Sequence, residues 1–275
     1  MEPLLPISAA RVFFDGIFTE PRVAHPEGVA VHADGSIWCG TETGDLLRID
    51  AEGKSVELMA ATGGFLLGIA FDSVGNCFAC DLRHAAIFRF DIATREFTRF
   101  ADAGIKVPNY PVVDAENGWL YVSDSTGDAG GIFRFDLKTG EGSPWCREKF
   151  AFANGMLMDH DGAGLYVVES DAPCVSYVPI EPDGTAGRKR VVVDGVHNVP
   201  DGLAFAPDGA LLISCYEPSR IYSWRQDRGL SLLIEDPAAT TLAHPTNVAL
   251  KGRRLYTANL GRWHITEIDL GSVFA

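Results

Sequence analysis

Short apolar runs alternate with polar turns along the whole chain, and one pattern of strands and turns recurs. Each copy has a run of small apolar residues, a turn rich in Asp and Gly, a second run ending in small or polar residues, and a third that mostly closes with Asp. β-Branched and aromatic residues alternate in these runs and Gly or Pro interrupts them, which indicates strands rather than helices. The copies begin at Glu27, Leu67, Asn109, Asn154, Asp201 and Thr246.

The spacing of the copies predicts the architecture. Successive copies start 40, 42, 45, 47 and 45 residues apart, and the link between copies adds a fourth β-rich run, such as SVELMA or KRVVVD. Six units of four antiparallel strands are typical of a six-bladed β-propeller, so we expect an all-β fold with a single domain over residues 1–275. The segment ARVFFDG is expected to complete the last blade beside HITEIDL, which would close the ring and favour a monomer.

The first residue of each copy carries the candidate chemistry. In a propeller the innermost strands line a central channel, so residues at the same phase form a ring. Four of the six residues have carboxylate or amide side chains that suit a hard cation, namely Glu27, Asn109, Asn154 and Asp201. No Lys or Arg occupies the ring, so one divalent cation would balance the two carboxylates. Oxygen-only ligation favours calcium, with magnesium, manganese, iron(II) or zinc as alternatives.

Turn chemistry offers a simpler explanation of the same residues. Asn-Gly and Asp-Gly pairs are common turn signals, so Asn154-Gly155 or Asp201-Gly202 alone would indicate only a turn. Four such residues at one phase of the repeat favour the cation site.

Composition narrows the classes of partner. The formal net charge of −14, from 23 basic and 37 acidic residues, opposes the phosphates of nucleic acid and the anionic surface of a membrane. The N-terminal stretch has no signal-peptide pattern, and no run approaches the ~20 apolar residues of a spanning helix. We therefore expect a cytoplasmic protein that acts on a small molecule. Cys77 and Cys80 form a CxxC motif, but residues three apart on a strand point to opposite faces, so all six cysteines are expected to be reduced.

At its repeat motifs the chain resembles the regucalcin, gluconolactonase and luciferin-regenerating enzyme family of six-bladed propellers, which includes sugar lactonases and, more distantly, diisopropyl fluorophosphatase. The segments PEGVAV, VPNYPVVD, FANGMLMD and VPDGLAFAPDG are similar to the family's metal-ligand segments, in the family's order. The resemblance covers nearly the whole chain. It implies a calcium-type site and the hydrolysis of a cyclic ester.

The chain departs from the family's sugar lactonases at the third-blade motif. Those members resemble one another in carrying Asn-Asp there, with an Arg two residues before the Asn. Here Asn109 is followed by Tyr110 and preceded at that distance by Val107. This departure predicts a substrate less polar than an aldonolactone. The residues expected to contribute to substrate binding at the channel mouth are Tyr110, His197, Tyr216 and Asn259.

The expected function is a metal-dependent lactonase in which Asp201 accepts a proton from the attacking water and Asn109 helps to orient the substrate; direct attack by Asp201 stays open. The chain has no GxSxG elbow, phosphate-binding loop, HExxH or EF-hand pattern, which argues against several other hydrolase and nucleotide-binding classes. Two alternatives remain. One is a non-catalytic, calcium-stabilised propeller that binds a small ligand or a protein, and the other is a phosphotriesterase-like or strictosidine-synthase-like propeller enzyme.

Overall fold

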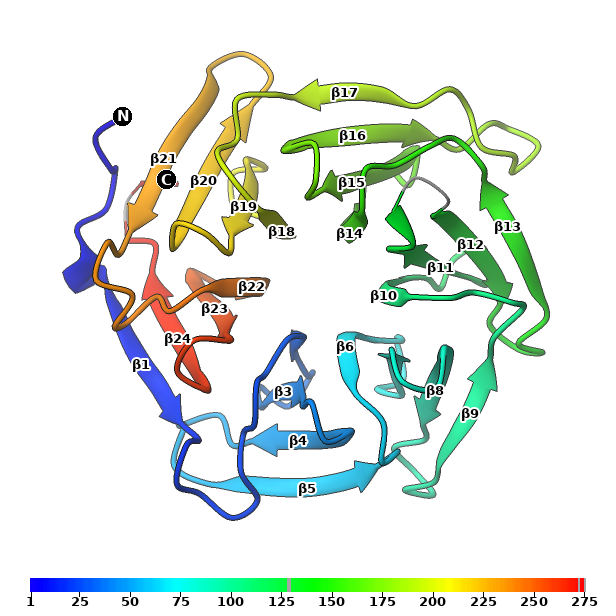
Figure 1. Ribbon diagram of the computed structural model, residues 1–275, viewed down its shortest axis with the longest axis horizontal. Helices are drawn as coiled ribbons and strands as arrows, with labels where there is room; N and C mark the ends of the chain where they lie inside the picture. The colour runs from blue at the N-terminus through cyan, green and yellow to red at the C-terminus, as the bar shows by residue number, and fades with distance from the viewer. Residues whose placement is uncertain (128–129, 272, 275) are drawn as a thin grey trace.

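The computed structural model describes residues 1–127, 130–271 and 273–274, which form six four-stranded sheets arranged in a ring (Figure 1). We call each sheet a blade. Every pair of neighbouring strands within a blade is antiparallel. The all-β, six-bladed propeller predicted from the repeat is therefore confirmed.

The strands of each blade run in order from the innermost to the outermost. Blade 1 contains β2 (Val29–Val31), β3 (Ile37–Gly40), β4 (Asp45–Ile49) and β5 (Val56–Ala61), and blade 2 contains β6 (Leu66–Phe71), β7 (Cys77–Asp81), β8 (Ala86–Phe90) and β9 (Phe97–Ala101). Blade 3 contains β10 (Pro108–Asp114), β11 (Trp119–Asp124), β12 (Gly131–Asp136) and β13 (Gly142–Cys146), and blade 4 contains β14 (Ala153–Met158), β15 (Gly164–Glu169), β16 (Cys174–Pro179) and β17 (Arg190–Val193). Blade 5 contains β18 (Pro200–Phe205), β19 (Leu211–Cys215), β20 (Arg220–Arg225) and β21 (Gly229–Glu235), and blade 6 contains β22 (Pro245–Lys251), β23 (Arg254–Asn259), β24 (His264–Asp269) and β1 (Ala10–Asp15).

Strands from the two ends of the chain close the ring within blade 6. The strand β1 pairs with β24, with Ala10 opposite Ile268 and Asp15 opposite His264. Before β1, the short 3-10 helix η1 (Ile7–Ala9) follows a segment whose backbone N–H groups at positions 4 and 5 donate to β21 of blade 5. The predicted closure by ARVFFDG beside HITEIDL is confirmed.

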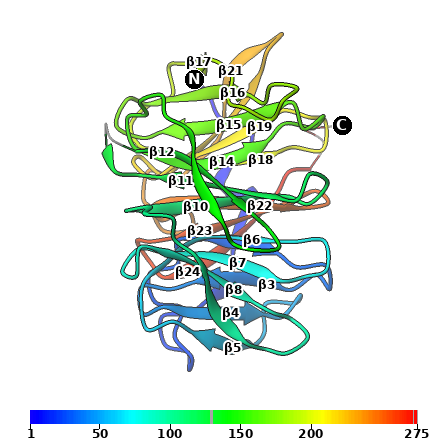
Figure 2. The same cartoon turned by 90° about the vertical axis from the view of Figure 1, so that its right-hand side faces the viewer.

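The connections between strands gather on the two faces of the ring, as the view in Figure 2 shows. We call the face where the inner strands begin the mouth face and the face where they end the far face. The first residues of the sequence repeats therefore lie toward the mouth face, since they occur at or just before the starts of the inner strands.

Six hydrophobic clusters fill the spaces between neighbouring blades. The two faces of β7 show the arrangement, because Cys77 packs with Trp38 of blade 1 while Cys80 packs with Leu120 of blade 3. The CxxC pair thus points in two directions, as the strand period requires. All six cysteines are buried and free. Within the described ranges, no helix has the length and apolar character needed to cross a membrane.

The inner strands of blades 2 to 6 share one irregularity. In each, the pairing with the second strand shifts by a β-bulge just after the first residue, as between Leu66 and Ile69 or between Pro200 and Leu203. The bulge holds the first residue of the sequence repeat and the residue after it. The phase assigned from the sequence is therefore the structural phase.

The residue after the first position of the repeat is glycine in four blades, because neighbouring inner strands meet there. A Cβ atom at Gly155 would lie 2.3 Å from the carbonyl oxygen of Asp201, and one at Gly28 would lie 2.4 Å from that of Leu67. No side chain fits at such distances. These glycines let each inner strand approach the next, which brings the ring residues together.

Replacing Gly155 by Ala is expected to lower the free energy of unfolding by about 1–3 kcal/mol, because the added methyl must displace the backbone at Asp201. The same displacement should weaken calcium binding. Urea unfolding and calorimetric titration measure the two effects.

Gly252→Ala is the matched control, because Gly252 has a positive φ of 61° and no atom lies within 4 Å of its added Cβ. It should cost about 1 kcal/mol of backbone strain and leave calcium affinity unchanged. Equal effects of both substitutions on calcium affinity would show that the close strand approach is unimportant.

Candidate metal centre

The four predicted ligands lie where inner strands begin. Asn109, Asn154 and Asp201 are the second residues of β10, β14 and β18, and Glu27 comes two residues before β2. Asn109, Asn154 and Asp201 are 3–5% exposed, whereas Glu27 keeps a larger exposed fraction. Three of the four side chains are therefore buried, and Glu27 is partly exposed.

Two asparagines hold the carboxylate of Asp201 in place. The side-chain Nδ2 of Asn154 donates to Oδ2 of Asp201 at 3.3 Å, and Nδ2 of Asn247 donates to Oδ1 at 3.0 Å. Asn154 Nδ2 also lies 3.1 Å from the hydroxyl of Ser170. Each carboxylate oxygen thus receives one amide N–H, which fixes the plane of the carboxylate.

Three amide oxygens at this centre have no hydrogen-bond donor among the residues that the structure describes. The Oδ1 atoms of Asn109, Asn154 and Asn247 are buried and unpaired. For Asn154 and Asn247 the orientation follows from chemistry, because their NH₂ groups face the carboxylate of Asp201 and their oxygens must point elsewhere. Leaving a buried acceptor unsatisfied costs about 1–3 kcal/mol each.

The two carboxylates also make the centre unfavourable without a counter-charge. Burial, followed by the charge of Asp201, raises the pKa of Glu27 well above its usual value. Burial raises the pKa of Asp201 to about 7, although the hydrogen bonds from Asn247 and Asn154 oppose the shift. Neither carboxylate forms an ion pair with a basic side chain in the described part of the protein.

These observations fit a hard divalent cation. Two carboxylates would neutralise its charge, and three amide oxygens without donors would gain a partner. Within residues 1–127, 130–271 and 273–274, no three His, Cys, Asp or Glu side chains cluster as metal ligands. The candidate set differs from such clusters because three of its five side chains are amides, a composition suited to calcium or magnesium rather than zinc.

Asn247 is the residue that the sequence analysis missed. The repeat phase assigns Thr246 to the ring, but its hydroxyl donates to the backbone carbonyl of Glu27 at 2.8 Å and so ties blade 6 to blade 1. The informative position is the residue after the first position of each repeat. Four blades have glycine there (Gly28, Gly68, Gly155 and Gly202), while blades 3 and 6 have Tyr110 and Asn247.

Tyr110 lies against the centre. Its backbone N–H donates to the hydroxyl of Ser123, and Gly68 makes room for its ring, since a Cβ there would meet the ring at 2.6 Å. Burial, then the charges of Cys80 and Asp201, raises the pKa of Tyr110 to about 12. Its hydroxyl therefore stays neutral at physiological pH.

Tyr216 and His197 lie in connections on the mouth face. His197 is exposed in the link between β17 and β18. Tyr216 follows β19, and its ring centroid lies 4.8 Å from that of His244. Nδ1 of His244 is 3.1 Å from both the carbonyl oxygen of Tyr216 and the carboxylate of Glu217. These three residues form a partly exposed cluster that sequence spacing did not indicate.

Asn259 lies beside this group, since it pairs with Pro245, the residue after His244, but its side chain is fully engaged. It is fully buried, its Oδ1 accepts the backbone N–H of Ala243, and its Nδ2 has four acceptors nearby from Thr257, His264 and Thr266. With every polar atom engaged, Asn259 serves to anchor the connection that leads into β22.

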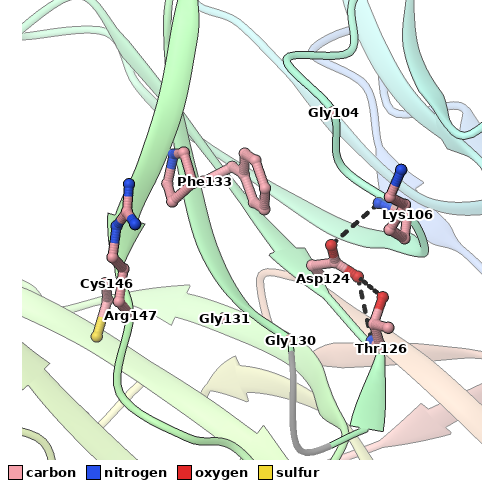
Figure 3. A pocket seen from close by; sticks show the side chains of 10 residues that line it. Gly104, Lys106, Asp124, Thr126, Gly130, Gly131, Phe133, Cys146 and Arg147 are labelled. Carbon is pink, nitrogen blue, oxygen red and sulfur yellow. Dashed lines mark hydrogen bonds between the residues drawn. The ribbon is translucent and has the colours of Figure 1, made fainter.

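Asp124 plays a similar anchoring part in blade 3. Its carboxylate accepts the backbone N–H groups of Lys106 and Val107, each at 3.0 Å, and both polar groups of Thr126 (Figure 3). These hydrogen bonds fix the position of the segment that leads into Asn109. A cavity of about 360 Å³ adjoins it, lined by Gly104, Lys106, Phe133, Pro144, Cys146 and Arg147 among others. None of the four predicted ligands lines that cavity.

Fold and site together define a class of protein: a six-bladed β-propeller with an oxygen-rich candidate cation centre where its inner strands begin. A model of the SMP-30/Gluconolactonase/LRE-like region matches residues 67–259, most of the chain, and the chain belongs to this family. A shorter match, to the N-terminal region of strictosidine synthase-like proteins, spans residues 18–49. No curated protein matches the chain.

Several solved structures share the fold. A gluconolactonase from Xanthomonas campestris superposes with a TM-score of 0.78 at 18% identity, covering 95% of this chain and 89% of that one. A putative gluconolactonase gives 0.76 at 17% identity, covering 94% and 91%. A calcium-binding protein, regucalcin, from Agrobacterium tumefaciens gives 0.70 at 15% identity, covering 98% and 95%. At these identities the likeness establishes the fold alone.

Calcium should stabilise the protein more at high pH than at low pH. Folding raises the pKa of Glu27 and Asp201, so the metal-free folded state gains stability from them that is complete below about pH 4 and is lost as pH rises through about 7. Calcium binds the deprotonated carboxylates. Thermal melts at about pH 5.5 and about pH 8 should show a larger calcium-induced rise in Tm at the higher pH. An equal or smaller rise at the higher pH would contradict the assignment.

Asn247→Ala should weaken calcium binding by about 10–100-fold, the usual effect of removing a group that orients a metal ligand. Isothermal titration calorimetry measures the change. Asn259→Ala is the matched control: it removes another buried asparagine of blade 6, so it should lower Tm while calcium affinity stays within about twofold. If both variants lose affinity alike, Asn247 acts only through the stability of blade 6.

Proposed function

We propose that the chain is a metal-dependent lactonase that opens a small cyclic ester at the mouth-face centre, with calcium as the resident ion. The single observation that carries the proposal is that two carboxylates without a basic partner and three amide oxygens without donors, both judged among the described residues, occur together where inner strands begin. Membership of the gluconolactonase family supports the same reaction class.

A bound divalent cation supplies positive charge that polarises an ester carbonyl and acidifies water. Glu27, Asn109, Asn154 and Asp201 are the proposed ligands, with the amide oxygen of Asn247 close by. Asn109 is also proposed to orient the substrate, because its Oδ1 has no donor within the protein.

Asp201 is proposed as the general base that accepts a proton from the attacking water. Binding of the cation would keep the Asp201 carboxyl deprotonated, the form that can accept a proton. The N–H groups of Asn154 and Asn247 hold each of its oxygens at a fixed angle, so the proton-accepting lone pairs have one orientation. Such positioning reduces the reorganisation that proton transfer would otherwise require.

The substrate is proposed to be less polar than a sugar lactone. Val107 and Tyr110 bring an aliphatic side chain and a neutral phenol to the motif beside Asn109. Tyr216, whose ring lies tilted against that of His244, and the exposed His197 offer further contacts on the mouth face.

The decisive experiment is lactone hydrolysis followed with a pH indicator, using aliphatic and sugar γ- and δ-lactones. Protein stripped with EDTA should be inactive and should regain activity with calcium. Asp201→Asn should lower kcat by at least about 100-fold, because an amide cannot accept the proton. Aliphatic lactones should give the higher kcat/KM.

Asp34→Asn is the matched control, since Asp34 lies in the turn between β2 and β3 on the far face and pairs with Arg48. It should leave kcat unchanged. Absence of turnover with every lactone, together with a large rise in Tm on adding calcium, would replace the lactonase with a calcium-stabilised binding propeller.

A further inference from the structure

The groove between blades 3 and 4 shows how this fold recognises an oxygen acceptor on its far side. The guanidinium of Arg134 lies 4.3 Å from the ring centroid of Trp119. Arg134 and the indole Nε1 of Trp145 both donate to the carbonyl oxygen of Gly184, the indole at 2.9 Å. Gly184 belongs to the connection between β16 and β17, which reaches from blade 4 toward blade 3 (Figure 1). In this groove the backbone carbonyl of Gly184 therefore occupies the position in which a ligand could accept hydrogen bonds from Arg134 and Trp145.

The next groove, between blades 4 and 5, is left open. The connection between β16 and β17 spans residues 180–189, but the equivalent connection of blade 5, between β20 and β21, spans only residues 226–228. Three residues are too few to fold back over blade 4. A cavity of about 340 Å³ remains, lined by Asp159, Tyr166, Tyr177, Arg190, Val192, Trp224 and Gln226.

The walls of this cavity are aromatic. Tyr166 and Tyr177 pack edge to face with centroids 5.0 Å apart, and Trp224 of blade 5 stands across from them in the same cavity. The guanidinium of Arg190 lies 5.0 Å from the ring centroid of Tyr177. An arginine stacked on a ring and an indole therefore recur here, as in the groove that Gly184 fills.

Both carboxylate oxygens of Asp159 accept a hydrogen bond from the protein, whereas the guanidinium of Arg190 is left for a ligand. Asp159 accepts the hydroxyl of Tyr177 at 3.0 Å on Oδ2 and the backbone N–H of His160 at 2.8 Å on Oδ1. Arg190 has no carboxylate partner among the residues that the structure describes, and no protein acceptor there takes the indole N–H of Trp224. A ligand that fits must bring an acceptor, and the free guanidinium favours a negative one.

We propose that this groove is a second binding site, for a small organic carboxylate with a flat, apolar ring as its body. The carboxylate pairs with Arg190 and with the indole N–H of Trp224, and the ring lies among Tyr166, Tyr177 and Trp224. The cavity volume is in the range of small-molecule pockets, about 300–1,000 Å³, whereas a stable protein partner would need about 1,000 Å² of buried surface.

The site is separate from the candidate metal centre. Asn154 is the second residue of β14, and Asp159 follows the other end of that strand. The two sites therefore lie on opposite faces of the ring. Binding in the groove can be tested whether or not the protein hydrolyses lactones.

Benzoate is the probe, and its neutral analogue benzamide is the comparison. Titration is followed by the indole N–H resonance of Trp224 in ¹⁵N-labelled protein, identified by its loss in Trp224→Phe. We expect a saturable shift with a Kd of about 1 mM or tighter for benzoate and binding at least about tenfold weaker for benzamide. The indole resonance of the buried Trp38 should not move, because its Nε1 is held by Ser36 in the core of another blade.

Arg190→Met should raise the Kd for benzoate at least about tenfold, and Arg190→Lys should raise it less, because lysine keeps the charge but loses the planar fork. Arg228→Met is the matched control: Arg228 lies in the short blade 5 connection but outside the cavity, and the Kd should stay within about twofold. An unchanged Trp38 resonance verifies folding in each variant. The proposal fails if Trp224 shows no saturable shift up to about 10 mM benzoate, if benzamide binds equally well, or if Arg190→Met has no effect.

Discussion

Two buried carboxylates that face one another without a basic partner set the conditions for the rest of this molecule. Burial raises the pKa of both Glu27 and Asp201, the charge of Asp201 raises that of Glu27 further, and three amide oxygens are buried there without donors among the described residues. Such a centre is unfavourable by several kcal/mol on its own, and a single ion of charge two resolves both defects together. A fold that carries this local cost must recover it elsewhere, which is common at functional sites.

The surrounding architecture supplies that support. Six apolar clusters hold neighbouring blades together, and glycines in the bulges let adjacent inner strands touch. At the ends of second strands, side chains bind the backbone of the connection that leads into the inner strand of the same blade, as Asp124, Glu169 and Asn259 do. The ring residues are therefore positioned by packing on one side and by hydrogen-bonded loops on the other, so little freedom remains where the ion would bind.

The architecture could be predicted from the sequence because the residues that define the repeat act through local conformational preferences. They are strand-forming residues, Gly at turns, and Asp at strand ends. The same phase brought out Glu27, Asn109, Asn154 and Asp201, whose joint action as ligands is still to be tested. Asn247 was not predicted because the repeat alignment takes one position per blade, and in blade 6 that position is Thr246. The bulge holds two successive residues, so Asn247 also belongs to the site. Asn259 was grouped with the mouth because strand-end position does not reveal that its polar atoms are satisfied. The groove between blades 4 and 5 is formed by strands from two blades. It stays open because the connection between β20 and β21 is short, and no local sequence pattern predicts this combination.

The closure of blade 6 by strands from both ends of the sequence has a consequence for folding during translation. The strand β1 is synthesised first, yet its partner β24 is among the last segments to emerge. The strand β1 therefore has no partner strand until β24 has been synthesised, after the strands of the other five blades. During that interval the nascent chain exposes an unprotected strand and an open arc of sheets, both of which invite pairing with other chains. The pairing of β1 with β24 joins strands far apart in the sequence, and such pairings form slowly compared with local ones. It converts the open arc into a ring and covers the exposed strand edge.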